Sequence, residues 1–223
     1  MCKLTYFSLK NILNSTCIGR GSEGTVYVDN DQAYKFSNTF LQGSLFSPKP
    51  INYVNLDIIG YYNMVKNKVK FTNLPTQLID YKRVTVGVIY PYYQNYKPFS
   101  QLYLENNDLF LTKLYELVRN NIELLENGIF NGDIQNSNVL YNQNDLQIID
   151  LDSKWINKDE SYTNNVYYLL MMIKSVIHNK LLELGYNEKE IYKIIEDFNL
   201  KYETIIIQKY FDKTLSKMQT IIK

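Results

Sequence analysis

The character of the sequence changes at Pro91, and this change limits the folds that the chain can adopt. Before Pro91, short apolar runs with alternating patterns are bounded by turn residues, which is typical of β-strands. After Pro91, apolar residues recur every three to four positions, which is typical of amphipathic helices. The sequence therefore predicts an α+β fold in which a strand-rich part, 1–90, and a joining segment, 91–96, precede a helix-rich part, 97–223.

The first part predicts a small antiparallel sheet that carries one helix. The strand regions are 18–28, which includes a glycine-rich loop, 33–36, 76–81 and 85–90. Asp29-Asn30-Asp31 predicts a hairpin turn. The apolar spacing of residues 52–68 is near that of a helix, and residues 37–51 predict a loop.

The second part predicts a long amphipathic helix over residues 107–126, with Asn106 or Asn107 as its N-cap. Residues 141–145 predict a hairpin that leads into a strand over 146–150. Helices are expected from about Asn165 onward. Asn187, with Glu190 three residues later, predicts a capping box at the start of one of them.

Composition argues against several classes of function. The 223 residues are 45% hydrophobic, enough for one globular unit in two lobes, and the net charge of +1 gives no basic stripe for nucleic acid. The single histidine, His178, lies in an apolar helical stretch, which argues against histidine chemistry. We expect a cytoplasmic protein without a membrane partner, for three reasons. Its two cysteines, Cys2 and Cys17, suggest no disulfide framework, and its N-terminus does not resemble a signal peptide. Its longest apolar run, Val166 to Ile173, is too short to cross a bilayer.

Residues 19–26, G-R-G-S-E-G-T-V, form the glycine-rich loop. Gly19, Gly21 and Gly24 would let the backbone approach phosphate oxygens that a side chain would keep at a distance. A dinucleotide-binding loop would be followed by a helix, whereas strand-like sequence follows here. The loop should therefore lie in a β-hairpin, and a nicotinamide cofactor is disfavoured.

Lys35 lies on the next predicted strand, in A-Y-K-F over residues 33–36. If its ammonium group faced the glycine-rich loop, it would be a point charge for two adjoining phosphates. The alternative is an ordinary exposed lysine on a strand.

Asp133, Asn138 and Asp150 follow in order within a loop and at the end of a predicted strand. Phosphoryl transfer needs a carboxylate near the acceptor hydroxyl, oxygen ligands for magnesium and positive charge on the phosphates. Asp133 can supply the first, and Asn138 and Asp150 can supply the second. Each residue alone also suits a turn or a cap, but the ordered set, together with the glycine hairpin and Lys35, rarely arises by accident.

These motifs resemble those of the protein kinase-like superfamily over nearly the whole chain. Residues 19–26 are similar to its glycine-rich loop and 33–35 to its V-A-I-K strand. Residues 131–138, N-G-D-I-Q-N-S-N, are similar to its catalytic loop H-R-D-L-x-x-x-N, and 150–152, D-L-D, to D-F-G. The resemblance implies a bilobal kinase fold with ATP and Mg²⁺, or Mn²⁺, in its cleft.

The resemblance also assigns roles to individual residues. It implies that Lys35 contacts the α- and β-phosphates, that Asp133 is the catalytic base, and that Asn138 and Asp150 hold the metal. Segment 90–95 resembles the hinge that receives adenine. The other nucleotide-binding candidates are Gly19, Gly21, Ser22, Gly24, Val26, Tyr90 and Tyr92.

Several positions depart from the family pattern. Asn131 and Gly132 replace the His and Arg of H-R-D, which argues against regulation through a phosphorylated activation loop. Asp152 replaces the glycine of D-F-G. The helix glutamate that pairs with the lysine is missing, and Asp57 is the candidate for that role beside Lys35, although a surface or capping role fits Asp57 equally well.

The phosphate acceptor stays open at this point. A protein Ser/Thr hydroxyl is the first choice, with Ser22 or Thr25 as sites of autophosphorylation. A small-molecule hydroxyl, as in the aminoglycoside and choline kinase branches, is the alternative, since no A-P-E follows and only the short segment 153–164 precedes the next helix. A pseudokinase-like scaffold that binds nucleotide without turnover is the other alternative, because the helix glutamate is missing and H-R-D is altered.

Overall fold

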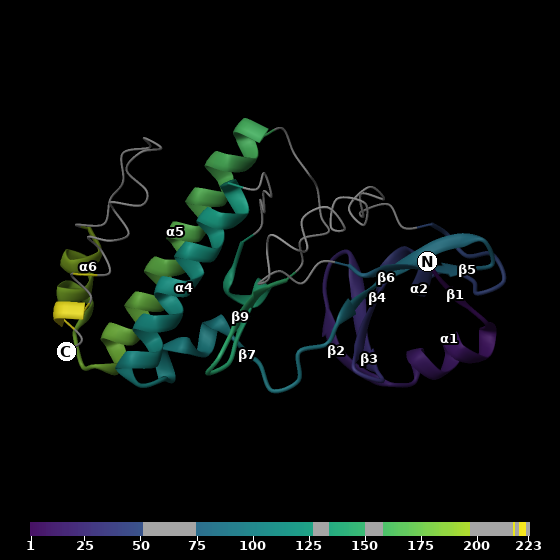
Figure 1. Ribbon diagram of the computed structural model, residues 1–223, viewed down its shortest axis with the longest axis horizontal. Coiled ribbons are helices and arrows are strands. Elements are labelled where there is room, and N and C mark those ends of the chain that lie inside the picture. Colours follow the sequence, from purple (N-terminus) through teal and green to yellow (C-terminus); the bar gives the residue numbers. More distant parts are fainter. Residues whose placement is uncertain (51–74, 127–133, 150–157, 197–215, 217–218, 222–223) are drawn as a thin grey trace. The chain divides into compact units, whose positions relative to one another are not determined.

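The computed structural model describes residues 1–50, 75–126, 134–149, 158–196, 216 and 219–221. The fold is α+β, with a mixed sheet and a helical part (Figure 1). The chain divides into two compact units. Unit 1 is Met1–Tyr96 together with Ile148–Trp155, and unit 2 is Lys97–Gln147 together with Ile156–Lys223.

Unit 1 contains a six-stranded sheet in the order β1-β5-β6-β4-β3-β2. Its strands are β1 (Cys2–Leu4), β2 (Thr16–Arg20), β3 (Gly24–Asp29), β4 (Gln32–Ser37), β5 (Gln77–Tyr81) and β6 (Val84–Pro91). All neighbours are antiparallel except β1, which pairs parallel to β5 with Cys2 opposite Ile79. The expectation of a wholly antiparallel sheet is therefore wrong at this edge, because a three-residue strand shows no alternation that a sequence pattern can detect.

Two of the hairpin turns of this sheet, β3-β4 and β5-β6, use left-handed backbone. The predicted turn between β3 and β4 is confirmed, with φ of 46° at Asn30 and 58° at Asp31. Two consecutive positive φ angles match the twist of a two-residue hairpin, and Asn and Asp tolerate them well. The turn between β5 and β6 has φ of 50° at Lys82 and 65° at Arg83, where the side chains favour this region less.

Two helices flank this sheet in sequence, and neither was predicted. Helix α1 (Tyr6–Leu13) begins at a capping box between Thr5 and Ser8 and buries Leu9 and Ile12. The short helix α2 (Asn38–Leu41) begins directly after β4, where a loop over 37–51 was predicted, and Ser37 caps it. The expectation of a single helix is therefore wrong, and the predicted helix over 52–68 lies outside the described residues.

One face of the sheet forms the core of unit 1 with these two helices. In Figure 1, α1 lies along this sheet. The Phe40 ring of α2 lies 5.8 Å from the Phe36 ring and 6.1 Å from that of Tyr81, centroid to centroid. The buried residues of this core are Leu9, Ile12, Tyr34, Phe36, Phe40, Ile79, Tyr81, Val86 and Ile89.

Unit 2 carries the helical part and a three-stranded sheet in the order β7-β8-β9. Its strands are β7 (Lys97–Pro98), β8 (Val139–Tyr141) and β9 (Leu146–Ile148). Its helices are the 3₁₀-helices η1 (Phe99–Leu104) and η2 (Asn136–Asn138) and the α-helices α4 (Asn107–Glu126), α5 (Lys158–Glu183) and α6 (Glu188–Glu196). The hairpin between β8 and β9 is confirmed, and the Asn142 N–H donates to the Asp145 carbonyl at 3.0 Å.

The predicted helix ends of unit 2 are confirmed where local capping signals define them. Asn106 Oδ1 accepts a 2.9 Å hydrogen bond from the Leu109 N–H and starts α4. Asn187 and Glu190 form the predicted capping box of α6, with bonds of 3.0 and 3.1 Å. Helix α5 begins at Lys158 rather than near Asn165.

A charged network fixes η1 within unit 2. Glu105 Oε1 accepts hydrogen bonds from Lys97 Nζ at 2.6 Å and from Tyr141 Oη at 3.0 Å. The buried Lys180 Nζ donates to the carbonyls of Tyr103 and Glu105 at 3.2 and 2.9 Å. The hydrogen bond from Lys97 lowers the pKa of Glu105, and the bond from Tyr141 adds to this effect, while burial opposes it.

Candidate functional site

The glycine-rich loop forms a tight turn between β2 and β3, in the predicted hairpin. Gly19 lies in β2, Gly21 and Ser22 lie in the turn, and Gly24 and Val26 lie in β3. The Gly21 N–H donates to the Gly24 carbonyl at 2.9 Å and closes the turn. Beyond the turn, β2 and β3 pair along their length, with Gly19 opposite Val26. All five predicted loop residues thus lie at one end of a single hairpin.

The three glycines of the loop are glycine for different reasons. None of them has a left-handed φ. A Cβ on Gly24 would lie 2.5 Å from the Phe36 carbonyl oxygen, so close packing of β3 against β4 requires glycine there. Among the described residues, a Cβ on Gly19 would meet nothing within 4 Å, and one on Gly21 would meet only the Gly24 carbonyl at 3.8 Å. The described fold does not require glycine at 19 and 21, whereas the close approach of a ligand would.

Lys35 lies on a sheet face that we call the lysine face. Directly opposed residues share a face of a sheet, and the register places the following residues together: Val26, Val28, Ala33, Lys35, Val88 and Tyr90. Tyr34 and Phe36, the alternate residues of β4, point into the core of unit 1. The lysine face is therefore the face opposite α1 and α2.

The alternative of an ordinary exposed lysine is wrong, since Lys35 is only 7% exposed. Lysine is rarely buried to this degree, because removing an ammonium group from water costs free energy. A Cβ added to Gly24 would lie 3.4 Å from Lys35 Cγ, so the lysine side chain runs beside the end of the glycine turn. The structure thus brings Gly24, Val26, Lys35 and Tyr90 together on one side of the sheet.

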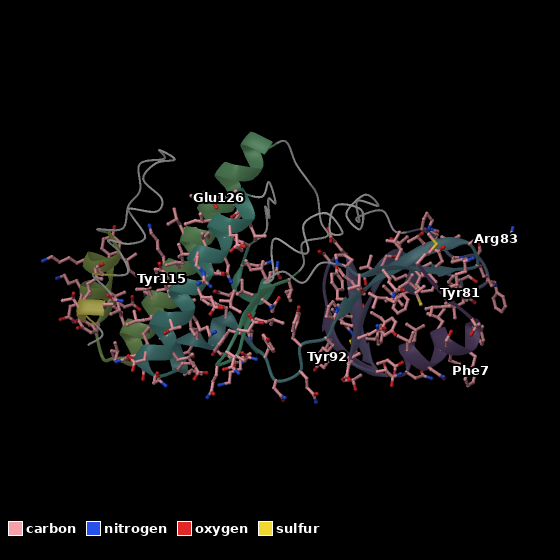
Figure 2. The ribbon with its side chains drawn as sticks, viewed as in Figure 1. Phe7, Tyr81, Arg83, Tyr92, Tyr115 and Glu126 are labelled. Atoms are coloured by element: carbon pink, nitrogen blue, oxygen red, sulfur yellow. The ribbon has the colours of Figure 1, made fainter. Side chains whose placement is uncertain are left out.

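The predicted hinge residues lie at the end of β6. Tyr90 is 6% exposed and belongs to the lysine face. Tyr92 follows the strand, as the label in Figure 2 shows, and its N–H donates to the Asp31 carbonyl at 3.2 Å. The backbone donor of Tyr92 is therefore already engaged within unit 1.

Asn138 is the one predicted metal ligand among the described residues, and it lies in unit 2. It ends η2, is 7% exposed, and its Oδ1 accepts a 3.3 Å hydrogen bond from Ser137 Oγ. Asp133, Asp150 and Asp57 lie outside the described residues, as do the family departures at 131, 132 and 152. Within the described part of the chain, no three His, Cys, Asp or Glu side chains gather as a metal site.

Asn38, which no sequence pattern singled out, contacts the glycine turn. Its Nδ2 donates to the carbonyls of Gly21 and Ser22 at 2.8 and 3.0 Å. The only local signal is a small polar residue directly after an apolar strand, which also suits an ordinary loop. Its role depends on a contact across 16 and 17 positions in sequence, and no local pattern reports such a contact.

A surface pocket of about 640 Å³ lies elsewhere, in unit 2, beside the end of η1, the start of α4 and the end of α5. Glu105, Asp108, Lys180 and Glu183 are among its lining residues. It contains none of the predicted site residues, so it does not support the predicted chemistry.

None of the helices in the described ranges combines the length and the apolarity that crossing a bilayer requires. No protein family model matches the chain, and no curated protein matches it.

Proposed function

We propose that this chain is an ATP-dependent phosphotransferase of the protein kinase-like type, with residues 1–90 as the N-terminal lobe, 91–96 as the hinge and 97–223 as the C-terminal lobe. One observation carries the proposal: Lys35 is buried on β4, opposite Val26 of the strand that leaves the glycine turn, and its side chain runs beside Gly24. A hairpin of this kind next to a buried cation suits a polyphosphate, which needs close backbone approach and positive charge.

Each residue has a role in the proposed reaction. The acceptor hydroxyl oxygen forms a bond to the γ-phosphorus of ATP while the bond to the β-γ bridging oxygen breaks and ADP leaves. Asp133 accepts the proton of the hydroxyl. Lys35 holds the α- and β-phosphates, and Asp57 is the proposed carboxylate partner of Lys35.

A magnesium ion fits the predicted donors, because one carboxylate and one amide oxygen are hard ligands of the kind that Mg²⁺ prefers. Asn138 and Asp150 would hold it, and it would offset the negative charge of the phosphates. Val26 and Tyr90, on the lysine face, suit the flat apolar surface of adenine.

The proposed acceptor is a protein Ser/Thr hydroxyl, and we place the reaction in the cytoplasm. The short segment 153–164 and the absence of A-P-E favour a small-molecule hydroxyl as the second candidate. The altered H-R-D favours a nucleotide-binding scaffold without turnover as the third. These candidates differ in what happens to the γ-phosphate, so one turnover experiment can separate them.

The test measures ADP release from Mg-ATP by the full chain and by Asp133→Asn, which keeps the size of the side chain but cannot accept a proton. Loss of a general base lowers turnover about 10²- to 10⁴-fold. Mass spectrometry of the chain before and after incubation with ATP then identifies phosphorylated Ser or Thr, including Ser22 and Thr25. A wild-type chain that binds ATP but releases ADP no faster than Asp133→Asn would indicate a scaffold and overturn the enzymatic proposal. Turnover with added small alcohols and an unmodified chain would indicate the small-molecule acceptor.

A further inference from the structure

We propose that Asn38 is a positioning residue that holds the glycine turn with its N–H groups available to phosphate oxygens, an inference that rests on the proposed function. Asn38 is half-buried at the first position of α2, directly after the strand that carries Lys35. It contacts three consecutive residues of the turn.

Asn38 engages most of the carbonyl groups of the turn. Its Nδ2 donates to the carbonyls of Gly21 and Ser22 at 2.8 and 3.0 Å, and its backbone N–H donates to the carbonyl of Glu23 at 3.0 Å. The Gly24 carbonyl accepts from the Gly21 N–H at 2.9 Å. All four consecutive carbonyls, from Gly21 to Gly24, thus accept hydrogen bonds from within the hairpin or from Asn38.

This arrangement determines what the turn presents to a ligand. Carbonyl oxygens repel phosphate oxygens, whereas N–H groups attract them. Within the described part of the chain, the N–H groups of Ser22 and Glu23 donate to no group, and Ser22 is exposed. With its four carbonyls engaged, the turn keeps the successive N–H groups of Ser22 and Glu23 for a ligand, and Gly24, at the end of the turn, lies beside the side chain of Lys35.

The amide of Asn38 suits this position better than a carboxylate would. Thr25 Oγ1 donates to Asn38 Oδ1 at 3.3 Å, which fixes the amide with its Nδ2 toward the turn. Asparagine is therefore acceptor and donor at once and carries no charge. An aspartate here would place a negative charge against two carbonyl oxygens and near the phosphates, and it would lack the donor.

The first test compares the affinity of the full chain for Mg-ATP and for adenosine by titration calorimetry in wild type, Asn38→Ala and Asn38→Asp. We expect ATP to bind about 5- to 10-fold more weakly to Asn38→Ala, and still more weakly to Asn38→Asp, because preorganised donors are lost. Adenosine should bind all three alike. A general loosening of the fold would weaken both ligands equally, so equal losses, or no loss for ATP, would overturn the role of Asn38 in phosphate binding.

Thr85→Val is the matched control. It removes one side-chain hydrogen bond of the same sheet, the 2.8 Å bond from Thr85 Oγ1 to Asp80 Oδ1, without contact to the glycine turn. Its ATP affinity should stay within about twofold of wild type. An ATP loss in Thr85→Val as large as that in Asn38→Ala would show that any weakened sheet has this effect, and it would overturn the proposal.

Hydrogen exchange of the Gly21 N–H without ligand separates the inference from the proposed function. This N–H is bonded to the Gly24 carbonyl, so its exchange should become faster in Asn38→Ala and stay unchanged in Thr85→Val. Unchanged exchange in Asn38→Ala would overturn the positioning of the turn, whatever binds to it. A wild-type chain that binds neither ATP nor inorganic triphosphate would overturn the proposed function and the phosphate role, while the exchange result would still decide whether Asn38 holds the turn.

Discussion

Replacing Gly24 with alanine should force β3 away from β4. The added Cβ would lie 2.5 Å from the carbonyl oxygen of Phe36, 3.3 Å from its carbonyl carbon and 3.4 Å from Lys35 Cγ. Non-bonded heavy atoms prefer separations of about 3.5–4.0 Å, so the two backbones must part by a large fraction of an ångström. Overpacking of this kind costs about 1–3 kcal/mol.

Gly19→Ala is the control, because a Cβ on Gly19 meets no described atom within 4 Å. Its stability should stay within about 0.5 kcal/mol of wild type. Urea denaturation at pH 7 measures the free energy of unfolding of both variants, and calorimetry measures their affinity for Mg-ATP. Under the proposed function, Gly19→Ala should weaken ATP binding without loss of stability, because its methyl group takes the space that a phosphate needs. The packing argument would be refuted if Gly24→Ala were as stable as wild type. It would also be refuted if Gly19→Ala lost as much unfolding free energy as Gly24→Ala.

Two further predictions concern stability alone. The pKa of Glu105 is lowered, so its ionised form stabilises the fold above its unfolded pKa of about 4.5, and this contribution is lost as the pH falls through the lower folded pKa. In urea denaturation at pH 7, the free energy of unfolding of Glu105→Gln should therefore be about 1 kcal/mol lower than that of wild type. This difference in unfolding free energy should shrink toward pH 3, and a difference that stays constant with pH would contradict the assignment. Arg83→Gly should stabilise the chain by about 0.5–1 kcal/mol in thermal melts, because glycine accepts a φ of 65° without strain, whereas Arg83→Ala should bring no gain; equal melting temperatures for the two variants would argue against strain at this turn.

The sequence predicted those elements whose signals are local. Helix α4 has its cap, Asn106, immediately before apolar residues at helical spacing, among them Phe110, Leu114 and Leu117, and these three are fully buried. The box at the start of α6 and the turn at Asn30 and Asp31 also involve only neighbours in sequence. In each case the residues that determine the structure lie within one or two turns of the chain, so a short window contains the whole signal.

The elements that the sequence did not predict depend on distant partners or on weak local signals. Strand β1 exists through its pairing with β5, where Cys2 lies opposite Ile79, and three residues show no period. Helix α1 buries only Leu9 and Ile12, and Ser8, rather than a glutamate or glutamine, completes the box with Thr5. Their stability comes from tertiary packing, which overrides local propensity in helices this short.

The lysine face shows why a sequence motif can be predicted when the burial of its residues cannot. The motif predicted that Lys35 would lie near the glycine turn, but no local pattern predicted that it would be buried on one face with Ala33, Val88 and Tyr90. A strand of an antiparallel sheet with one solvent-exposed face alternates polar and apolar residues. Strand β4 differs, because residues on both of its faces are buried. Phe36 and its neighbours in the core cluster of unit 1 hold β4 in place, and Lys35, which alternates with them along the strand, takes its position from this packing. The placement of Lys35 beside Gly24 is therefore determined by packing on the other side of the same strand, so a substitution in the core that shifts β4 would displace the lysine as well.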